Sequence, residues 1–251
     1  MKRLSAAVQT ATATDFAKCR GPEEDPISTT ARGQRLPKRE ILTNSVYDAL
    51  KIIVMNHEIE PASRVSIDAL AADLGVSQTP VREALARLES EGLVIKTPLR
   101  GYSTTPLLNE VQVEELFDLR RLMETWASGQ AAAAITPAGR KALLAELATC
   151  PVVPTGNSYR EFKEFADHDA RFHELLFRLA GNDAIREAWN HTHCHLHLFR
   201  LYYVRGLGQQ GLEEHHRITD AVCSGDIGEA EAATVAHLEA SRSRLLPAAH
   251  R

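Results

Sequence analysis

The first part of the chain shows apolar residues at helical spacing in three short segments, each bounded by residues that start or stop helices. Asn44 is the expected cap of a first helix. Ser66 is expected to cap a second helix, and Gly75 to end it as a glycine of positive φ. Thr79 and Pro80 then open a third helix, with threonine as the cap and proline at the first helical position.

Two short β-strands are predicted directly after these helices, over residues 93–96 and 102–105, with Arg100 and Gly101 at the tip between them. Three helices followed by a β-hairpin are the order of a winged helix-turn-helix. We therefore predict a DNA-binding domain of this type over residues 38–106.

The segment that precedes this domain, residues 1–37, is rich in Ala, Thr, Ser, Gly and Pro and shows no sustained apolar period. Such a composition is typical of a mobile tail. Its basic residues are candidates for contacts with phosphate: Lys2, Arg3, Arg32 and Arg35.

From residue 107 to residue 251 the apolar period is helical throughout, so we predict an all-α effector domain there. Proline and glycine residues divide it into helices near 109–134, 138–149, 158–180, 183–205, 212–224 and 226–246. The predicted fold class is mainly α, with an N-terminal winged helix followed by a helical bundle.

Composition narrows the class of protein. Hydrophobic residues make up 44% of the chain and charged residues 25%, as in an ordinary globular protein, and no apolar run is long enough to span a membrane. Without a secretory signal, the chain is expected to be cytoplasmic. The four cysteines form no C-x-x-C pair, so neither a disulfide framework nor a cysteine zinc site is implied. The net charge of −4 weighs against DNA binding, but a DNA reader needs only local positive charge.

The third helix carries the candidate DNA-reading residues at its N-terminal end. Gln78 and Arg82 lie four residues apart, and so share one face of that helix. Arginine suits guanine or phosphate, glutamine suits adenine, and hydroxyl groups suit phosphate. The predicted DNA-binding residues are Ser77, Gln78, Thr79 and Arg82 on the helix, and Arg100 and Gly101 in the hairpin.

This region resembles the GntR family of bacterial regulators, in the FadR-like branch that carries an FCD effector domain. The resemblance runs from about Ile41 to the C-terminus, and the matching residues are Leu74-Gly75-Val76-Ser77, Thr79 to Leu85, Leu88-Glu89, Glu91 to Val94 and Arg100-Gly101. Two departures stand out. The family usually has arginine at the position of Gln78, which changes the expected base preference, and glycines in the stretch here occupied by residues 56–62.

The effector domain contains a candidate metal site. Asp169 and His173 lie one helical turn apart on a stripe of phenylalanine and leucine, where a buried aspartate is costly unless it is paired or binds a metal. His215 lies ten residues before Gly225 and His237 twelve after it, so antiparallel helices would bring the two histidines level, roughly 15 and 18 Å from the turn. The FCD resemblance implies the same four ligands for a divalent ion: zinc, with nickel, manganese and iron as alternatives.

Arg120 is the candidate effector-binding residue, because it continues an inward apolar stripe and an inward arginine usually pairs with an anion. A salt bridge of Arg120 with Glu124 or Asp169 is the alternative. The histidine run from His191 to His197 is expected to line a pocket or face solvent, and a second metal site is the less favoured interpretation.

Together these features predict a homodimeric transcription regulator, more readily a repressor than an activator. It would bind a palindromic operator and sense a small organic acid through a metal-containing helical domain. One rival is a metal-dependent hydrolase fused to a DNA-binding domain, but no carboxylate stands out beside the predicted ligands as an acid or base, so no enzyme is expected. Another is a regulator for which the metal itself is the signal.

Overall fold

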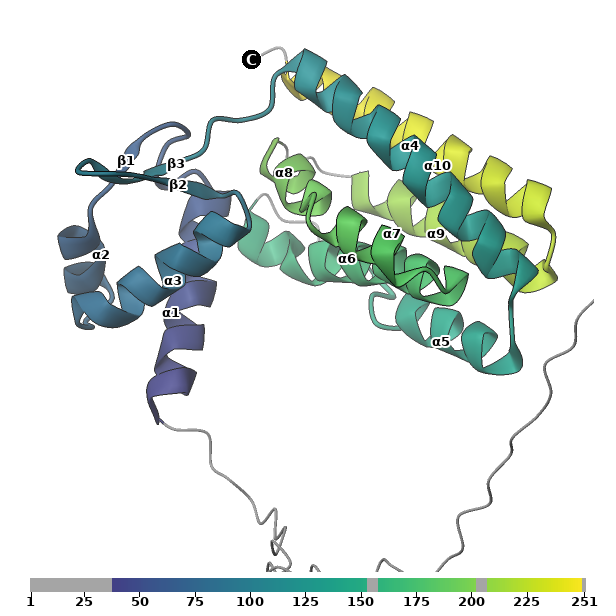
Figure 1. Cartoon of the computed structure of the whole chain (residues 1–251), viewed down its shortest axis with the longest axis horizontal. Helices are drawn as coiled ribbons and strands as arrows, with labels where there is room; N and C mark the ends of the chain where they lie inside the picture. Colours follow the sequence, from purple (N-terminus) through teal and green to yellow (C-terminus); the bar gives the residue numbers. More distant parts are fainter. Residues whose placement is uncertain (1–37, 153–157, 202–206, 250–251) are drawn as a thin grey trace, which may run out of the picture. The chain divides into compact units, whose positions relative to one another are not determined.

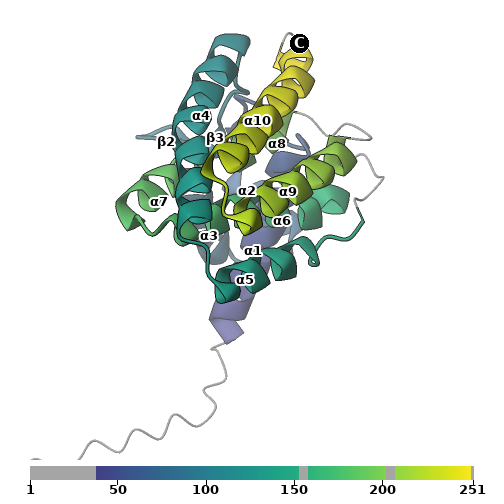
Figure 2. The same cartoon turned by 90° about the vertical axis from the view of Figure 1, so that its right-hand side faces the viewer.

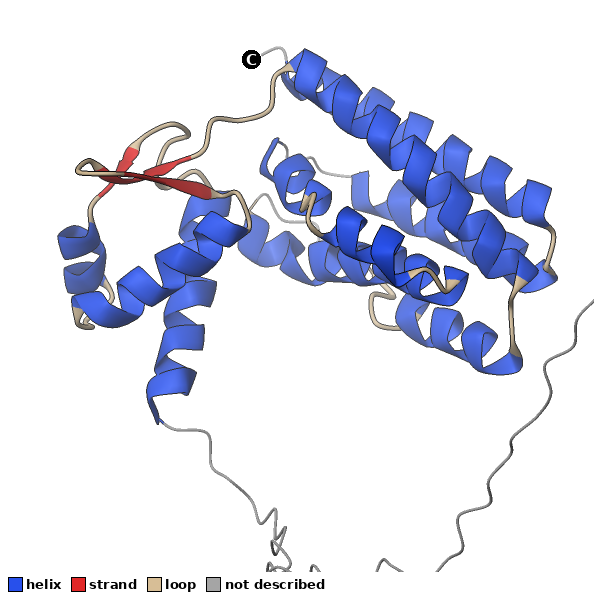
Figure 3. Cartoon of the chain, viewed as in Figure 1, coloured by secondary structure: helices blue, strands red, loops and turns tan. Residues whose placement is uncertain are grey.

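The computed structural model describes residues 38–152, 158–201 and 207–249 (Figure 1). The predicted tail over residues 1–37, with its four basic residues, lies outside the described residues. Helices dominate what is described, and the few strands belong to one small sheet (Figure 3).

The N-terminal part is a winged helix-turn-helix, as predicted. Its helices are α1 (Lys38–Met55), α2 (Ile67–Asp73) and α3 (Gln78–Ser90), and its strands are β1 (Arg64–Val65), β2 (Val94–Thr97) and β3 (Gly101–Thr104). The antiparallel sheet has the order β1-β3-β2, with Val65 opposite Tyr102 and Ile95 opposite Ser103. Strand β1 was not predicted, because two residues are too few to show an alternating period.

A capping residue explains where α2 begins. Ser66 caps α2 as predicted, since its side chain accepts a hydrogen bond from the amide of Ala69. The predicted cap at Thr79 is wrong, because α3 begins at Gln78 with Ser77 at the cap position, two residues before the predicted start at Pro80. The predicted cap at Asn44 is wrong, because α1 already begins at Lys38 and Asn44 lies inside it, where its side chain accepts a hydrogen bond from Arg87.

The C-terminal part is the predicted helical bundle (Figure 2). Its helices are α4 (Glu110–Ala133), α5 (Pro137–Leu147), α6 (Tyr159–Ala180), α7 (Asp183–Asn190), α8 (Cys194–Leu201), α9 (Leu207–Ser224) and α10 (Ile227–Ala249). Helices α4 and α10 lie side by side, and Glu231 of α10 places its carboxylate against Gly129 of α4.

The prediction of a single helix over residues 183–205 is wrong. This segment is divided into α7 and α8, and His193 between them has a φ of 46°, which an L-residue in a continuous helix does not adopt. The break turns the histidine run, so that its members face different surroundings. Helix α9 begins at Leu207, five residues before the predicted start at 212. No helix of the described ranges is long and apolar enough to cross a membrane.

Candidate functional site

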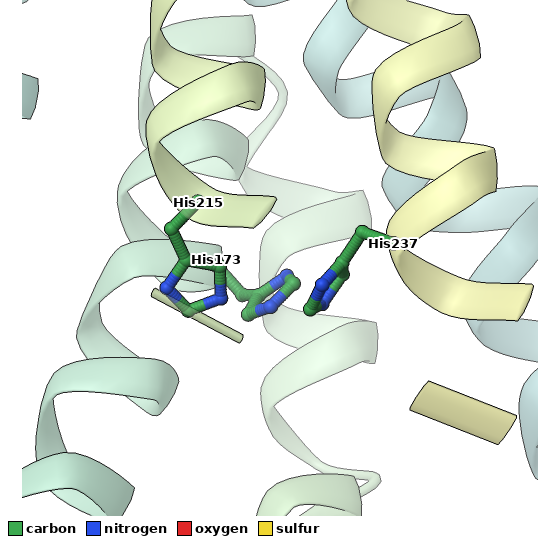
Figure 4. Close-up of side chains that lie close together, drawn as sticks. All are labelled: His173, His215 and His237. Carbon is green, nitrogen blue, oxygen red and sulfur yellow. The ribbon is translucent and has the colours of Figure 1, made fainter. Parts of the chain in front are cut away.

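The predicted ligands come from three helices of the bundle. Asp169 and His173 lie on α6, His215 on α9 and His237 on α10. The three histidines are buried, and each offers a nitrogen within 4.8 Å of the others (Figure 4). Their ring centroids are 5.1 to 5.3 Å apart. The tertiary structure therefore brings together residues that lie far apart in the sequence.

Asp169 completes this cluster from one side. Its Oδ1 lies 3.3 Å from Nε2 of His215 and 3.9 Å from Nε2 of His173, whereas its Oδ2 lies 2.5 Å from Nδ1 of His195. One carboxylate oxygen thus faces the histidine cluster and the other is held from behind. Burial favours the neutral acid, but the charge and the hydrogen bond of His195 outweigh it and hold the pKa of Asp169 well below its usual value.

Each clustered histidine has its Nδ1 beside a supporting side chain. The pairs are His173 with Glu124 Oε2 at 2.7 Å, His215 with His168 Nε2 at 3.1 Å, and His237 with Glu214 Oε2 at 2.8 Å. The Nδ1 atoms of His215 and His237 are engaged in hydrogen bonds, whereas Nδ1 of His173 lies beside Glu124 without a hydrogen bond of good geometry. Since each Nδ1 faces its support, Nε2 is the nitrogen left for a metal. The Nε2 atoms of His173 and His215 are buried and have no hydrogen-bond partner among the described residues.

The two supporting carboxylates are in turn held by arginines. Arg120 binds both oxygens of Glu124, at 2.6 and 3.2 Å, and Arg244 binds both oxygens of Glu214, at 2.7 and 2.8 Å. Burial alone would raise the pKa of Glu214, but hydrogen bonds from Arg244 and His237 lower it to about 2. Both supports therefore stay ionised, which is the form that accepts the imidazole N–H.

Burial also sets the protonation of the ligands themselves. It lowers the pKa of His173 to about 4 and that of His215 to about 3, against the opposing effects of nearby carboxylates. These imidazoles are thus neutral at neutral pH, the form that coordinates a metal. Three imidazoles and one carboxylate, with three orphaned buried nitrogens among them, fit a divalent transition-metal ion.

A cavity adjoins this cluster. Asp169 and His237 line it from the metal side, and aromatic side chains from α6 and α8 supply much of the remaining wall: Phe162, Phe165 and Phe199. Arg120, Arg244 and His195 also line it, and so bring polar atoms to an otherwise apolar space. An apolar cavity with a few convergent polar groups is the usual form of a small-molecule site.

The predicted DNA-reading residues are all exposed. Ser77, Gln78, Thr79 and Arg82 lie at the N-terminal end of α3, and Arg100 and Gly101 at the tip between β2 and β3. Arg82 donates a hydrogen bond of 3.1 Å to Gln78, and Gln78 donates one to Asp68 on α2. The guanidinium is therefore oriented by the glutamine that departs from the usual arginine. Contacts of these residues with bases or phosphates stay a prediction.

Comparison with known proteins matches the N-terminal and the C-terminal part of the chain to one family model each. The family model described as "Bacterial regulatory proteins, gntR family" matches residues 42–102, and the FCD domain model matches residues 115–240. The chain belongs to the GntR family. It is 32% identical to an uncharacterized HTH-type transcriptional regulator of Streptomyces ambofaciens over 78% of this chain and 81% of that protein.

Two further comparisons are with a named repressor and with a solved structure. The chain is 28% identical to the gluconate operon transcriptional repressor of Bacillus licheniformis, over 68% of each chain. The structure of E. coli McbR/YncC has the same fold, with a TM-score of 0.59, 21% identity and coverage of 82% of this chain and 97% of that one. The chain is thus an HTH-type transcription regulator with a winged helix and an FCD effector-binding domain.

Arg120 of this FCD domain was predicted either to bind the effector or to form a salt bridge with Glu124 or Asp169. Its side chain is buried and lines the cavity, and it forms the salt bridge with Glu124. The guanidinium is therefore already neutralised on one side, and a role in effector binding stays a prediction.

The break between α7 and α8 places the histidines of the run in different surroundings. His191 is exposed, whereas His195 is buried, lines the cavity and contacts Asp169. His216 is exposed, as its position beside the inward His215 requires. Two carboxylates lie against the ligands, Glu124 against His173 and Glu214 against His237. Both contact Nδ1, on the side of the ring remote from the cluster, and both are held by arginines.

Sequence reasoning missed the supports for a physical reason. Arg244 lies seven residues after His237 and therefore carries a helical-spacing signal once the ligands are known. Glu214 directly precedes His215 and carries none. His168 precedes Asp169 and gave no such signal, because adjacent residues point to different sides of a helix.

Proposed function

We propose that this GntR-family regulator senses a small organic acid through a divalent metal ion held by Asp169, His173, His215 and His237. The observation that carries the proposal is the convergence of three buried imidazoles, each with its Nδ1 beside a supporting side chain. Buried imidazole nitrogens without partners are costly in a folded protein, and a metal ion would remove that cost.

The ion would supply a Lewis-acidic centre to which a carboxylate can bind. Zinc suits the donor set best, and nickel, manganese and iron are the alternatives. Asp169 neutralises only one of the two charges, and the nearby Glu124 and Glu214 are each neutralised by an arginine. An anion entering the cavity would therefore gain from uncompensated positive charge among apolar walls, where Coulomb attraction is less screened.

Hydroxylated acids are the class of effector we favour. The related repressor of Bacillus licheniformis takes its name from the gluconate operon, and gluconate is a sugar acid with hydroxyl groups beside its carboxylate. The cavity of this chain joins apolar walls to polar groups on several sides, so it suits a small acid that carries further oxygen functions.

The winged helix would read a palindromic operator through Ser77, Gln78, Thr79, Arg82, Arg100 and Gly101. A palindrome requires two copies related by symmetry. Helix α4 offers a surface for pairing, since Val111, Leu119 and Leu122 lie on one face of it and are 65%, 39% and 75% exposed. We propose a homodimer built on this face, acting as a repressor in the cytoplasm, with domains over residues 38–106 and 107–251.

Metal analysis and calorimetry together test the proposal. The purified full-length protein is expected to hold about one divalent ion per chain. Gluconate, lactate or malate is expected to bind the metal-loaded protein and to weaken its binding to an operator fragment in a gel-shift titration. Chelator-treated protein is expected to lose the response to acid while keeping much of its DNA affinity, because none of the predicted DNA-reading residues belongs to the metal cluster. Equal acid affinity with and without metal would contradict a sensing role for the ion.

A further inference from the structure

His195 stands apart from the other histidines of the bundle. It lies on α8, which carries none of the predicted ligands, and the residue is only 6% exposed. It borders the cavity beside Asp169 and His237. Its ring centroid is 5.0 Å from that of His173, yet it is not one of the three histidines whose nitrogens converge.

The two ring nitrogens of His195 have different surroundings. Nδ1 lies 2.5 Å from Oδ2 of Asp169, the oxygen that faces away from the cluster. Nε2 is buried and has no hydrogen-bond partner among the residues the structure describes. His173 and His215 likewise have Nδ1 beside a support and Nε2 without a hydrogen bond, and there Nε2 is the nitrogen that would bind the metal.

His195 lines the cavity, and its unpaired buried Nε2 would be satisfied by a polar group of the molecule that fills this space. We propose that His195 is an effector-contacting residue, and that its Nε2 pairs with a hydroxyl group of the effector. A hydroxyl both donates and accepts hydrogen bonds, so it satisfies Nε2 whether or not that nitrogen carries a proton. A carboxylate only accepts hydrogen bonds. In the proposed function the carboxylate of the effector binds the metal ion instead.

This inference rests on the proposed function and narrows it. The effector class becomes hydroxy acids whose hydroxyl lies near the carboxylate, because Asp169 faces the cluster with one oxygen and contacts His195 with the other. His195 then distinguishes a hydroxy acid from the same acid without the hydroxyl. Such discrimination is strong where a buried polar group would otherwise stay unpaired.

Two substitutions test the roles of Nδ1 and Nε2 of His195 separately. In His195→Asn, the side-chain amide reaches the position of Nδ1 and can still contact Asp169, but it has no atom at the position of Nε2. In His195→Gln, the longer amide reaches the position of Nε2 but not that of Nδ1. His191→Asn is the matched control, since His191 is exposed and lies in the same histidine run.

The measurement is calorimetry on metal-loaded, full-length protein with two matched pairs of acids, lactate with propionate and malate with succinate. The wild type and His191→Asn are expected to prefer the hydroxy acid of at least one pair by about tenfold to a hundredfold, the cost of leaving one buried group unpaired. His195→Asn is expected to hold its metal, by elemental analysis, and to bind both acids of that pair alike. His195→Gln is expected to keep part of the preference.

The outcomes distinguish this inference from the proposed function. A wild type that binds the acids of each pair equally, or a His195→Asn variant that keeps the full preference, overturns the role of His195 and leaves acid sensing intact. If none of the four acids binds the wild type, both are overturned. If His195→Asn loses its metal, His195→Gln decides: a retained hydroxyl preference supports contact at Nε2, and its loss refutes it.

Discussion

The winged helix and the effector bundle present their polar residues in opposite ways. On α3 the side chains of Ser77, Thr79 and Arg82 are exposed and lie close together in the sequence. In the bundle, His173, His215 and His237 are buried, come from three helices and depend on a further ring of polar partners. A DNA-reading surface needs local sequence and exposure, whereas a buried polar site needs neighbours that satisfy it.

This difference has an energetic consequence. A substitution on the exposed face of α3 removes a contact with DNA and little from the fold, because the core residues Val81, Leu85 and Leu88 point the other way. A substitution in the buried cluster removes one partner from a network whose other members stay in a low-dielectric interior. Function and stability should therefore separate in the winged helix and change together in the bundle.

The largest effect is expected from removing two ligands at once. In His173→Ala/His215→Ala, the metal content should fall from about one ion per chain to near zero, because only Asp169 and His237 remain. Elemental analysis after gel filtration measures this. The control is His191→Ala/His216→Ala, which removes two exposed histidines. Retention of metal by the first variant would show that the site lies elsewhere, and operator binding should survive in both.

The buried salt bridge of Arg120 with Glu124 tests whether support and stability are linked. Arg120→Met leaves an uncompensated carboxylate beside His173, so the free energy of unfolding should fall by about 3–5 kcal/mol. Denaturant titration followed by circular dichroism measures the loss. Arg121→Met is the matched control, because the neighbouring Arg121 side chain is 61% exposed. An Arg120→Met variant of wild-type stability that no longer binds acid would instead make Arg120 an effector ligand.

The supporting carboxylate of Glu214 is expected to affect the affinity for metal. Glu214→Gln keeps the size of the side chain but weakens the orientation of His237, and metal affinity should fall by about tenfold to a hundredfold. Competition with a chromogenic chelator reports the affinity. Glu213→Gln changes the same charge on the exposed side of α9 and should leave affinity unchanged. Equal affinities for the two variants would remove Glu214 from the site.

In the winged helix, Arg82→Ala should weaken operator binding by about 1–3 kcal/mol. Its free energy of unfolding should stay within about 0.5 kcal/mol of the wild type, because the side chain is exposed. Gel-shift titration at one salt concentration measures the first quantity. Arg140→Ala removes an exposed arginine from α5 and serves as the control for net charge. If both variants bind alike, Arg82 is not at the interface.

Several helix boundaries and the placement of two ligands could be predicted, because they depend on residues that are close together in the sequence. Ser66 and Gly75 bound α2 through side-chain and backbone preferences that act over three or four residues. The level placement of His215 and His237 followed from counting residues on either side of Gly225, whose φ of 86° makes the turn. Helical rise is constant, so that count converts directly into distance.

Other features could be decided only by tertiary packing. Which nitrogen of each histidine is left for a metal depends on Glu124, His168 and Glu214, and each of these lies on a different helix from the ring that it supports. A polar contact changes over tenths of an ångström, whereas a sequence period specifies only a face of a helix. For the same reason the break at His193, and with it the burial of His195 against Asp169, appears only when the helices are packed.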